Sequence, residues 1–344
     1  MHLTLLVPGL LLPVEILEST TFDLTAPTLS LILGRGIRHT LPVDVFAHLF
    51  GLENLPAAAL RKVGAKGASS KGGAAASGGV ATASGAETAR GEWLCLDPVH
   101  WQVGASGVTL DDPAKLEIDP TESAALLEAV APLFADWGDL SASAPGRWEL
   151  RLEHSLDLET QPLAEAIDQP IDPSLPGGAD GPAWRRLLLE AQTVLHAHPV
   201  NRSREIAGRP TINSLWPWGQ GALPAKPSPA FDIVLSDDPV MVGLCAHAGI
   251  PCIPPSKVFQ PAKGRMLAVI EDLAAAARTL DALAWREALL AFERDWLSPA
   301  LGVCATLTLI GIRLGWQPTA LAYEWKRTDR LRFWRRPLPL TALK

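Results

Sequence analysis

The chain lacks the cysteine patterns that mark disulfide-rich or metal-binding proteins. Its 344 residues hold four scattered cysteines, with no Cys-x-x-Cys pair and no metal-ligand spacing, namely Cys95, Cys245, Cys252 and Cys304. Such spacing favours reduced thiols and predicts a cytoplasmic protein. The chain also lacks a basic excess. Its formal net charge of −7 argues against a nucleic-acid-binding face spread over the whole molecule.

Long apolar runs are missing as well. The N-terminal stretch MHLTLLVPGLLLP has no Lys or Arg before its apolar residues, and Pro8, Gly9 and Pro13 interrupt it. It is too short for a membrane span and has the wrong flanks for a signal peptide. We therefore predict no membrane span, and a buried first strand over 3–7 that runs into a turn.

Apolar residues make up 48% of the chain, which favours a folded protein. The patterns predict strands at 93–96, 107–110, 148–152, 211–216, 231–235, 265–270, 303–313 and 316–326. They predict helices within 26–62 and at 120–137, 182–197, 239–248, 271–283 and 285–297. Strands interleaved with helices indicate an α/β fold with a mostly parallel sheet flanked by helices.

Two composition shifts suggest how the chain is divided. Residues 64–91 are almost entirely Ala, Gly, Ser and Thr with a few charges, which predicts a disordered insertion. Residues 169–181 are rich in Pro, Gly and Asp. We expect an N-terminal α/β part at 1–150, a second α/β part at 182–344 and a connecting segment at 151–181. One continuous domain is the alternative.

The segment 196–221, HAHPVNRSREIAGRPTINSLWPWGQG, concentrates polar and aromatic side chains in 26 residues. Its three arginines suit carboxylate or phosphate, its asparagines donate and accept, and Trp216-Pro217-Trp218 supplies a rigid apolar wall. These features predict a pocket for a small anionic metabolite, lined by His198, Asn201, Arg202, Arg204, Asn213, Trp216, Trp218, Gly219 and Gly221. Structural alternatives stay open: a helix cap for His198, salt bridges for the arginines and core packing for the tryptophans.

Catalytic candidates are fewer. Asp97 and His100 could form an acid-base or metal pair, but a metal needs a third ligand that the local sequence does not offer. An Asp-Pro turn with a histidine bonded to backbone is the favoured interpretation. Asp237 is interpreted as a helix N-cap or its neighbour, with a metal role as the alternative. His198 is the last weak catalytic candidate.

The segment Lys326–Arg336 carries six basic residues and two aromatics with one acidic residue. This mixture is typical of contact with nucleic acid, an anionic membrane or a protein partner. The alternative is a solvated tail that folds back on an acidic body.

Three motifs carry a resemblance to a known family: HPVNRSREIAGRPTINSLWPWGQG, DPVHW at 97–101 and LRFWRRPLPL at 331–340. With them the chain resembles the RpfE-type regulatory proteins of proteobacteria, over nearly its whole length apart from 64–91. The resemblance implies a regulatory role, and that family supplies no established biochemistry.

A narrower resemblance covers residues 192–255. The pattern runs through His198-Pro199, Asn201, Arg204, Gly208, Asn213, Trp216, Trp218-Gly219 and Gly221, and continues in FDIVLSDDPVMVGLCAHAGI at 231–250. It is similar to cofactor-independent phosphoglycerate mutases, especially the archaeal type. This resemblance implies an alkaline-phosphatase-like α/β core, two divalent metals held by Asp and His ligands, and a nucleophilic Ser or Thr.

The chain departs from that pattern in three places. The first predicted strand ends in Val7-Pro8-Gly9-Leu10 where an Asp-Gly pair is expected, and no Ser or Thr follows in a glycine-flanked turn. The last histidine is His247, so the later histidine-bearing metal loop is missing. We therefore expect a phosphoglycerate-mutase-like core without its metal centre.

These observations predict a cytoplasmic, non-catalytic regulatory protein that binds a small anionic metabolite and needs no cofactor. The alternative is a phosphoester mutase or hydrolase that uses Asp97, His100, His198 and Asp237 in an atypical site with a divalent metal such as manganese. A second alternative is a scaffold that acts through its basic C-terminal tail.

Overall fold

The computed structural model describes residues 1–69, 89–104, 107–315 and 318–343. Its backbone contacts divide the chain into two compact units. Unit 1 comprises Met1–Asn54, Pro227–Met241 and Ala248–Lys344, and unit 2 comprises Leu55–Lys226 and Val242–His247.

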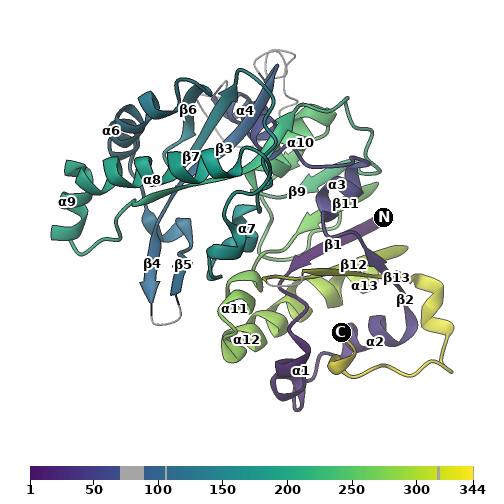
Figure 1. The fold of residues 1–344 in the computed structure, drawn as a ribbon. Helices are drawn as coiled ribbons and strands as arrows, with labels where there is room; N and C mark the ends of the chain where they lie inside the picture. The colour runs from purple at the N-terminus through teal and green to yellow at the C-terminus, as the bar shows by residue number, and fades with distance from the viewer. Residues whose placement is uncertain (70–88, 105–106, 316–317, 344) are drawn as a thin grey trace. The chain divides into compact units, whose positions relative to one another are not determined.

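Unit 1 is built on a seven-stranded sheet (Figure 1). Its strand order is β10 (Cys252–Ile253), β9 (Ile233–Leu235), β11 (Arg265–Val269), β1 (His2–Pro8), β12 (Thr306–Arg313), β13 (Thr319–Lys326) and β2 (Ile37–Leu41). The strands from β10 to β12 pair in parallel, whereas β13 runs antiparallel to both of its neighbours. The predicted α/β fold with a mostly parallel sheet is confirmed.

The central strand β1 shows why the sheet has two different faces. Leu3, Leu5 and Val7 belong to the buried core of the unit, whereas His2 is exposed and Thr4 half-buried on the opposite face. Alternate strand residues point to opposite faces, so the face that carries His2 and Thr4 also carries the fully buried Leu6. The helices of unit 1 are α1 (Val14–Thr21), α2 (Pro27–Arg35), α3 (Val45–Phe50), α11 (Ala274–Arg278), α12 (Ala282–Phe292) and α13 (Ser298–Val303).

Two helix predictions in this unit are corrected. Residues 37–41 lie in a region predicted to be helical, yet they form β2, because the edge of β13 offers them backbone partners. The helix predicted over 271–283 is shorter and is split. Leu280 has a positive φ of 54°, and Asp281 then caps α12 by accepting from the backbone N–H groups of Leu283 and Ala284.

Unit 2 contains a four-stranded antiparallel sheet with the order β6 (Gly138–Ala144), β7 (Arg147–Leu152), β3 (Glu92–Val99) and β8 (Ser214–Ala222). A hairpin, β4 (Trp101–Gly104) and β5 (Gly107–Leu110), follows β3. Its helices are α4 (Ala57–Ser69), α6 (Pro120–Val130), α7 (Leu163–Ala166), α8 (Gly181–Ala197) and α9 (Pro199–Ile206). Trp148 from β7 and Trp184 from α8 are fully buried in the core between sheet and helices.

The division into units follows sheet pairing and not chain order. Strand β1 pairs with β11 and β12, so the first 54 residues lie with the last third of the chain, whereas the sequence placed its boundary at 151–181. α10 (Pro239–Ala248) has residues in both units. The predicted disordered insertion begins within α4, which is helical to Ser69, and residues 70–88 lie outside the described part.

Short 3-10 or π segments complete the chain at Pro113–Leu116, Ala131–Phe134, Asp172–Ser174, Glu293–Leu297, Arg327–Leu331 and Leu340–Ala342. Among the described residues, no helix combines the length and the apolar character that a bilayer crossing requires.

Candidate functional site

The predicted ligand-binding segment 196–221 folds into helix α9, a loop and strand β8 of unit 2. His198 caps α9, where its Nδ1 accepts from the backbone N–H of Val200 at 3.2 Å. Asn201 is buried, donates to the carbonyls of Leu195 and Ile212 at 2.7 and 2.8 Å, and accepts from Ile212 N at 2.8 Å. Its amide therefore ties two loop segments together.

The three arginines of the segment have different surroundings. Arg204 is 1% exposed and donates to the Glu122 carboxylate at 2.6 Å and to the Pro210 carbonyl at 2.7 Å. Arg209 reaches the second oxygen of Glu122 at 3.1 Å. Arg202 is exposed at the surface of α9. Glu122 thus pairs with two arginines through one carboxylate, and no sequence pattern marks this partner 82 residues from Arg204.

Polar side-chain atoms at the start of β8 also bond to other protein atoms. Asn213 accepts from Trp101 N at 2.7 Å and donates to its carbonyl at 2.9 Å, which joins β8 to the start of the hairpin. Trp216 is 1% exposed and its indole N–H donates to the Gln161 carbonyl at 3.0 Å. Gly219 and Gly221 have φ of 65° and 148° where they approach Ala57 and Pro56, and an added Cβ would lie within 3 Å of those side chains.

Asp97 lies in a buried ion cluster of unit 2. The Arg61 guanidinium donates to its two oxygens at 2.7 and 2.8 Å, and the indole N–H of Trp218 donates to Oδ2 at 2.8 Å. Arg61 also lies 2.7 Å from Oε1 of Glu149, whose other oxygen is 3.4 Å from the Lys62 ammonium. We call Arg61, Lys62, Asp97 and Glu149 the buried ion cluster.

Charge balance within the buried ion cluster decides its chemistry. Burial raises the pKa of Glu149, although the charges of Arg61 and Lys62 oppose the shift. Burial disfavours the charge of Arg61, but the Asp97 carboxylate and the other negative groups nearby raise its pKa well above the usual value. Two cations and two carboxylates meet in a small buried volume, which is the arrangement that makes buried charges tolerable. Asp97 therefore has its acceptor capacity filled by side chains of its own unit.

His100 is separated from Asp97 in its interactions. Its Nδ1 lies 2.7 Å from the Thr211 carbonyl, which matches the favoured interpretation of a histidine bonded to backbone. The predicted Asp-Pro turn is corrected, because Asp97 and Pro98 lie within strand β3 and pair with β8. Among the described residues, no hydrogen bond joins His100 to Asp97. The structure gives structural partners to most of the predicted site residues, and their ligand-binding or catalytic roles stay predictions.

Asp237 lies at the carboxyl end of β9, where parallel sheets generally bind ligands. Asp238, its neighbour, caps α10 by accepting from Met241 N at 2.8 Å, and Gly249 follows that helix with a φ of 79°. Glu271 follows the adjacent strand β11. Partial loss of hydration, with the negative charges of Asp238 and Asp237, raises the pKa of Glu271. Asp237, Asp238, Glu271 and Asp272 form what we call the acidic edge.

The acidic edge does not supply the ligand set that a two-metal centre needs. Within the described part of the chain, no three His, Cys, Asp or Glu side chains are arranged so that they could hold a metal ion. Strand β1 ends at Pro8 without a carboxylate, and Nε2 of His247, the last histidine, lies 2.9 Å from the Pro224 carbonyl. Such centres require several carboxylate and imidazole ligands around each ion.

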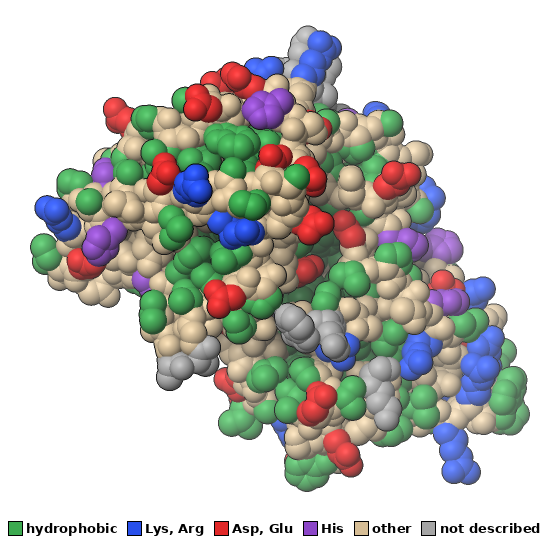
Figure 2. All heavy atoms as spheres, viewed as in Figure 1, with side chains coloured by type: hydrophobic (Ala, Val, Ile, Leu, Met, Phe, Trp, Pro, Cys, Tyr) green, Lys and Arg blue, Asp and Glu red, His purple; other side chains and the backbone are tan. Residues whose placement is uncertain are grey.

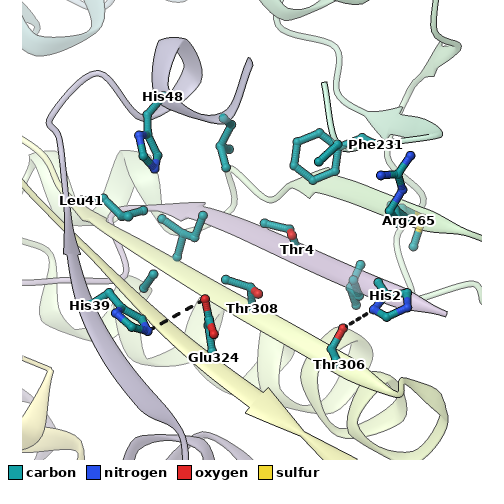
Figure 3. Close-up of a pocket in the computed structure, with 16 residues that line it drawn as sticks. His2, Thr4, His39, Leu41, His48, Phe231, Arg265, Thr306, Thr308 and Glu324 are labelled. Carbon is teal, nitrogen blue, oxygen red and sulfur yellow. Dashed lines mark hydrogen bonds and ion pairs between the residues drawn. The ribbon is translucent and has the colours of Figure 1, made fainter. Parts of the chain in front are cut away.

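A cavity of about 330 Å³ lies on the polar face of the unit 1 sheet (Figure 3). His2 and Thr4 come from β1, Thr306 and Thr308 from β12, His39 from β2, Glu324 from β13 and His48 from α3. The His2 imidazole lies 2.6 Å from the Thr306 hydroxyl, and His39 lies 3.9 Å from Glu324. We call this cavity the sheet-face pocket. Strand pairing brings these residues together from distant parts of the chain.

Comparison with known proteins relates part of the chain to 2,3-bisphosphoglycerate-independent phosphoglycerate mutases. It is 32% identical to that of Methanosarcina barkeri over 103 residues, which is 28% of this chain and 26% of the relative. It is 38% identical to that of Methanosarcina mazei over 68 residues (20% and 17%), and 29% identical to that of Methanothrix thermoacetophila over 118 residues (34% and 30%). These matches span less than a third of the relatives' length. No family model matches the chain.

Two solved structures are similar over most of their length but at low scores. They are a cofactor-independent phosphoglycerate mutase from Thermoplasma acidophilum (TM-score 0.41, 14% identity, 99% of this chain and 94% of that one) and the PH0037 protein from Pyrococcus horikoshii (0.48, 13%, 99% and 91%). The predicted partial resemblance to cofactor-independent phosphoglycerate mutases is confirmed by the sequence matches. The resemblance to RpfE-type proteins receives no support from the comparisons and stays a prediction.

Proposed function

We propose that the protein binds a small phosphorylated carboxylic acid of the phosphoglycerate type, through the sheet-face pocket. The partial homology to phosphoglycerate mutases carries the choice of ligand class. A regulatory role, as the sequence predicts, would then consist in sensing such a metabolite.

The chemistry of the sheet-face pocket supports this ligand class. Its volume of about 330 Å³ falls within the range of small-molecule sites. Three imidazoles, those of His2, His39 and His48, can donate hydrogen bonds to phosphate or carboxylate oxygens, and two threonine hydroxyls can do the same. Glu324 is the acidic residue of the lining and lies 3.9 Å from Nε2 of His39.

The segment 196–221 is a weaker place for the ligand. Arg204, Asn201 and Asn213 already direct their polar groups to protein partners, and binding an anion there would require breaking those hydrogen bonds. Arg202 alone is exposed, and one cation without a concave surface gives little affinity.

The test is calorimetric titration of the whole chain and of its variants with 3-phosphoglycerate. We expect binding by the unmodified chain that is at least tenfold weaker in the double variant His39→Gln/His48→Gln, roughly the loss of two charge-assisted hydrogen bonds. Asp237→Asn is the matched control outside the sheet-face pocket. Binding that Asp237→Asn abolishes and the histidine variant leaves intact would refute the placement.

A second candidate function is a phosphoester mutase or hydrolase at the acidic edge. It is favoured by the carboxylates of Asp237, Asp238, Glu271 and Asp272 at the ends of adjacent strands and by the activity named for the relatives. A divalent metal such as manganese would supply charge neutralisation there. Because the donor set does not fit a two-metal centre, we derive no catalytic step through it. Manganese-dependent interconversion of 3- and 2-phosphoglycerate that Asp237→Asn removes would establish this function instead.

A further inference from the structure

A solvent-exposed cluster of large apolar and basic side chains closes the chain in unit 1. Leu331, Phe333 and Trp334 are 72%, 80% and 67% exposed. Exposed basic side chains surround them, from Lys326, Arg327, Arg330, Arg335 and Arg336. We call these eight residues the basic-aromatic surface. Figure 2 shows blue Lys and Arg side chains beside green hydrophobic ones at the lower right, where Figure 1 places the C-terminal segment.

The backbone beneath this surface is held in place. Arg35 at the end of α2 donates to the carbonyls of Arg335 at 3.1 Å and Arg330 at 2.8 Å. Leu338 N donates to the Ser30 carbonyl at 3.0 Å, and the buried Leu340 anchors the segment that follows. The exposed side chains are therefore presented by an ordered loop and not by a free tail, which lowers the entropy cost of binding.

The basic-aromatic surface carries an excess of positive charge. In the described part of the chain, no ion pair engages Arg327, Arg335 or Arg336, whereas Arg332 pairs with Asp329 at 3.0 Å. A local excess of positive charge within a protein of net charge −7 attracts anionic partners.

We propose that the basic-aromatic surface binds an anionic lipid bilayer, with Phe333 and Trp334 inserted at the headgroup level. Aromatic side chains favour the membrane interface, and a ring of Lys and Arg around them binds acidic headgroups. The two rings meet edge to face, with centroids 5.3 Å apart and an interplanar angle of 80°. Leu331, two residues before Phe333, is exposed as well.

This arrangement is less suited to nucleic acid. Single-stranded binding uses aromatic faces spaced along a groove, so that successive bases stack on them. Here the two rings are adjacent in sequence and meet edge to face, so their faces are not spaced for successive bases. Nucleic acid is therefore the alternative outcome of the test.

The experiment is flotation of the whole protein with vesicles of phosphatidylcholine containing about 30% phosphatidylglycerol, compared with pure phosphatidylcholine. We expect binding only to the anionic vesicles, and a loss of affinity of about fivefold for each arginine removed, so about 25-fold in Arg335→Gln/Arg336→Gln. Phe333→Ala/Trp334→Ala is expected to lose at least tenfold.

Matched controls come from elsewhere in unit 1. Phe22 is 78% exposed, and Phe22→Ala should leave vesicle binding unchanged. Lys257→Gln/Lys263→Gln removes two exposed charges that lie outside the basic-aromatic surface, and it should also leave vesicle binding unchanged. Binding to neither vesicle type, equal losses in the control variants, or binding to a single-stranded oligonucleotide in place of vesicles would each overturn the proposal.

Discussion

The buried ion cluster offers the sharpest test of the structure, through the substitution Arg61→Met. Arg61 is 4% exposed and makes contacts of 2.7 to 3.0 Å with the carboxylates of Asp97 and Glu149. Removing it leaves two carboxylates, 2% and 0% exposed, with only Lys62 as a nearby cation. Breaking a buried ion pair on one side costs about 3–5 kcal/mol, a large share of the about 5–15 kcal/mol that stabilises a typical protein.

The pH dependence of the loss has a defined sign. Burial raises the pKa of Glu149 in the folded state, and Arg61 opposes this shift. Without Arg61 the folded pKa rises further above its unfolded value, so the folded state takes up more protons than the unfolded state. The free energy of unfolding of Arg61→Met should therefore recover as the pH falls towards the unfolded pKa of glutamate, and decrease as the pH rises through the folded pKa.

The assay is urea unfolding of the unmodified protein and of Arg61→Met at several pH values, followed by tryptophan fluorescence and by circular dichroism. Because the chain has two units, the curves are fitted with two transitions where the probes disagree. Arg186→Met, at an exposed position on α8 of the same unit, is the control and should change stability by less than about 0.5 kcal/mol. A loss below about 1 kcal/mol in Arg61→Met, or a loss that grows on acidification, would refute the reasoning.

Two further predictions concern a buried arginine and a closely packed glycine. Arg204→Met should destabilise unit 2 by about 3 kcal/mol, because the Glu122 carboxylate loses its buried partner. Arg202→Met, at an exposed position, should leave the stability nearly unchanged. Thermal unfolding of the two variants side by side checks this difference. Gly34→Ala would place a Cβ 2.1 Å from the Arg336 carbonyl, so it should detach the C-terminal loop from α2 and increase its hydrogen exchange, whereas unchanged exchange would show that the contact is not formed.

The spacing of apolar residues was enough to predict the elements that have a simple burial pattern. The strand over residues 3–7 and the helix over 182–197 were predicted from apolar spacing and were found as β1 and α8. Residues 37–41 were predicted wrongly, because an edge strand takes its conformation from the neighbour that it pairs with. Local propensity holds no information about β13, which lies about 280 residues further along the chain.

The candidate site was harder to predict, for a related reason. The sequence singled out Asp97, Arg204 and Asn213 by residue type, yet it could not tell whether their polar atoms meet a ligand or other protein atoms. The answer depends on Arg61, Glu122 and Trp101, all remote in sequence or placed by the sheet. The polar residues of the sheet-face pocket were overlooked because each is unremarkable alone.

The amino-acid sequence alone was enough to predict the α/β class, the buried first strand over 3–7 and the concentration of basic and aromatic residues near the C-terminus. These follow from local spacing and composition, which act over a few residues. The fold was needed to show that the first 54 residues complete a sheet with the last third of the chain. It was also needed to show that Arg204 and Arg209 bond to Glu122, and that Phe333 and Trp334 remain exposed. Pairing between distant segments decides which polar groups are satisfied internally and which stay available for a partner.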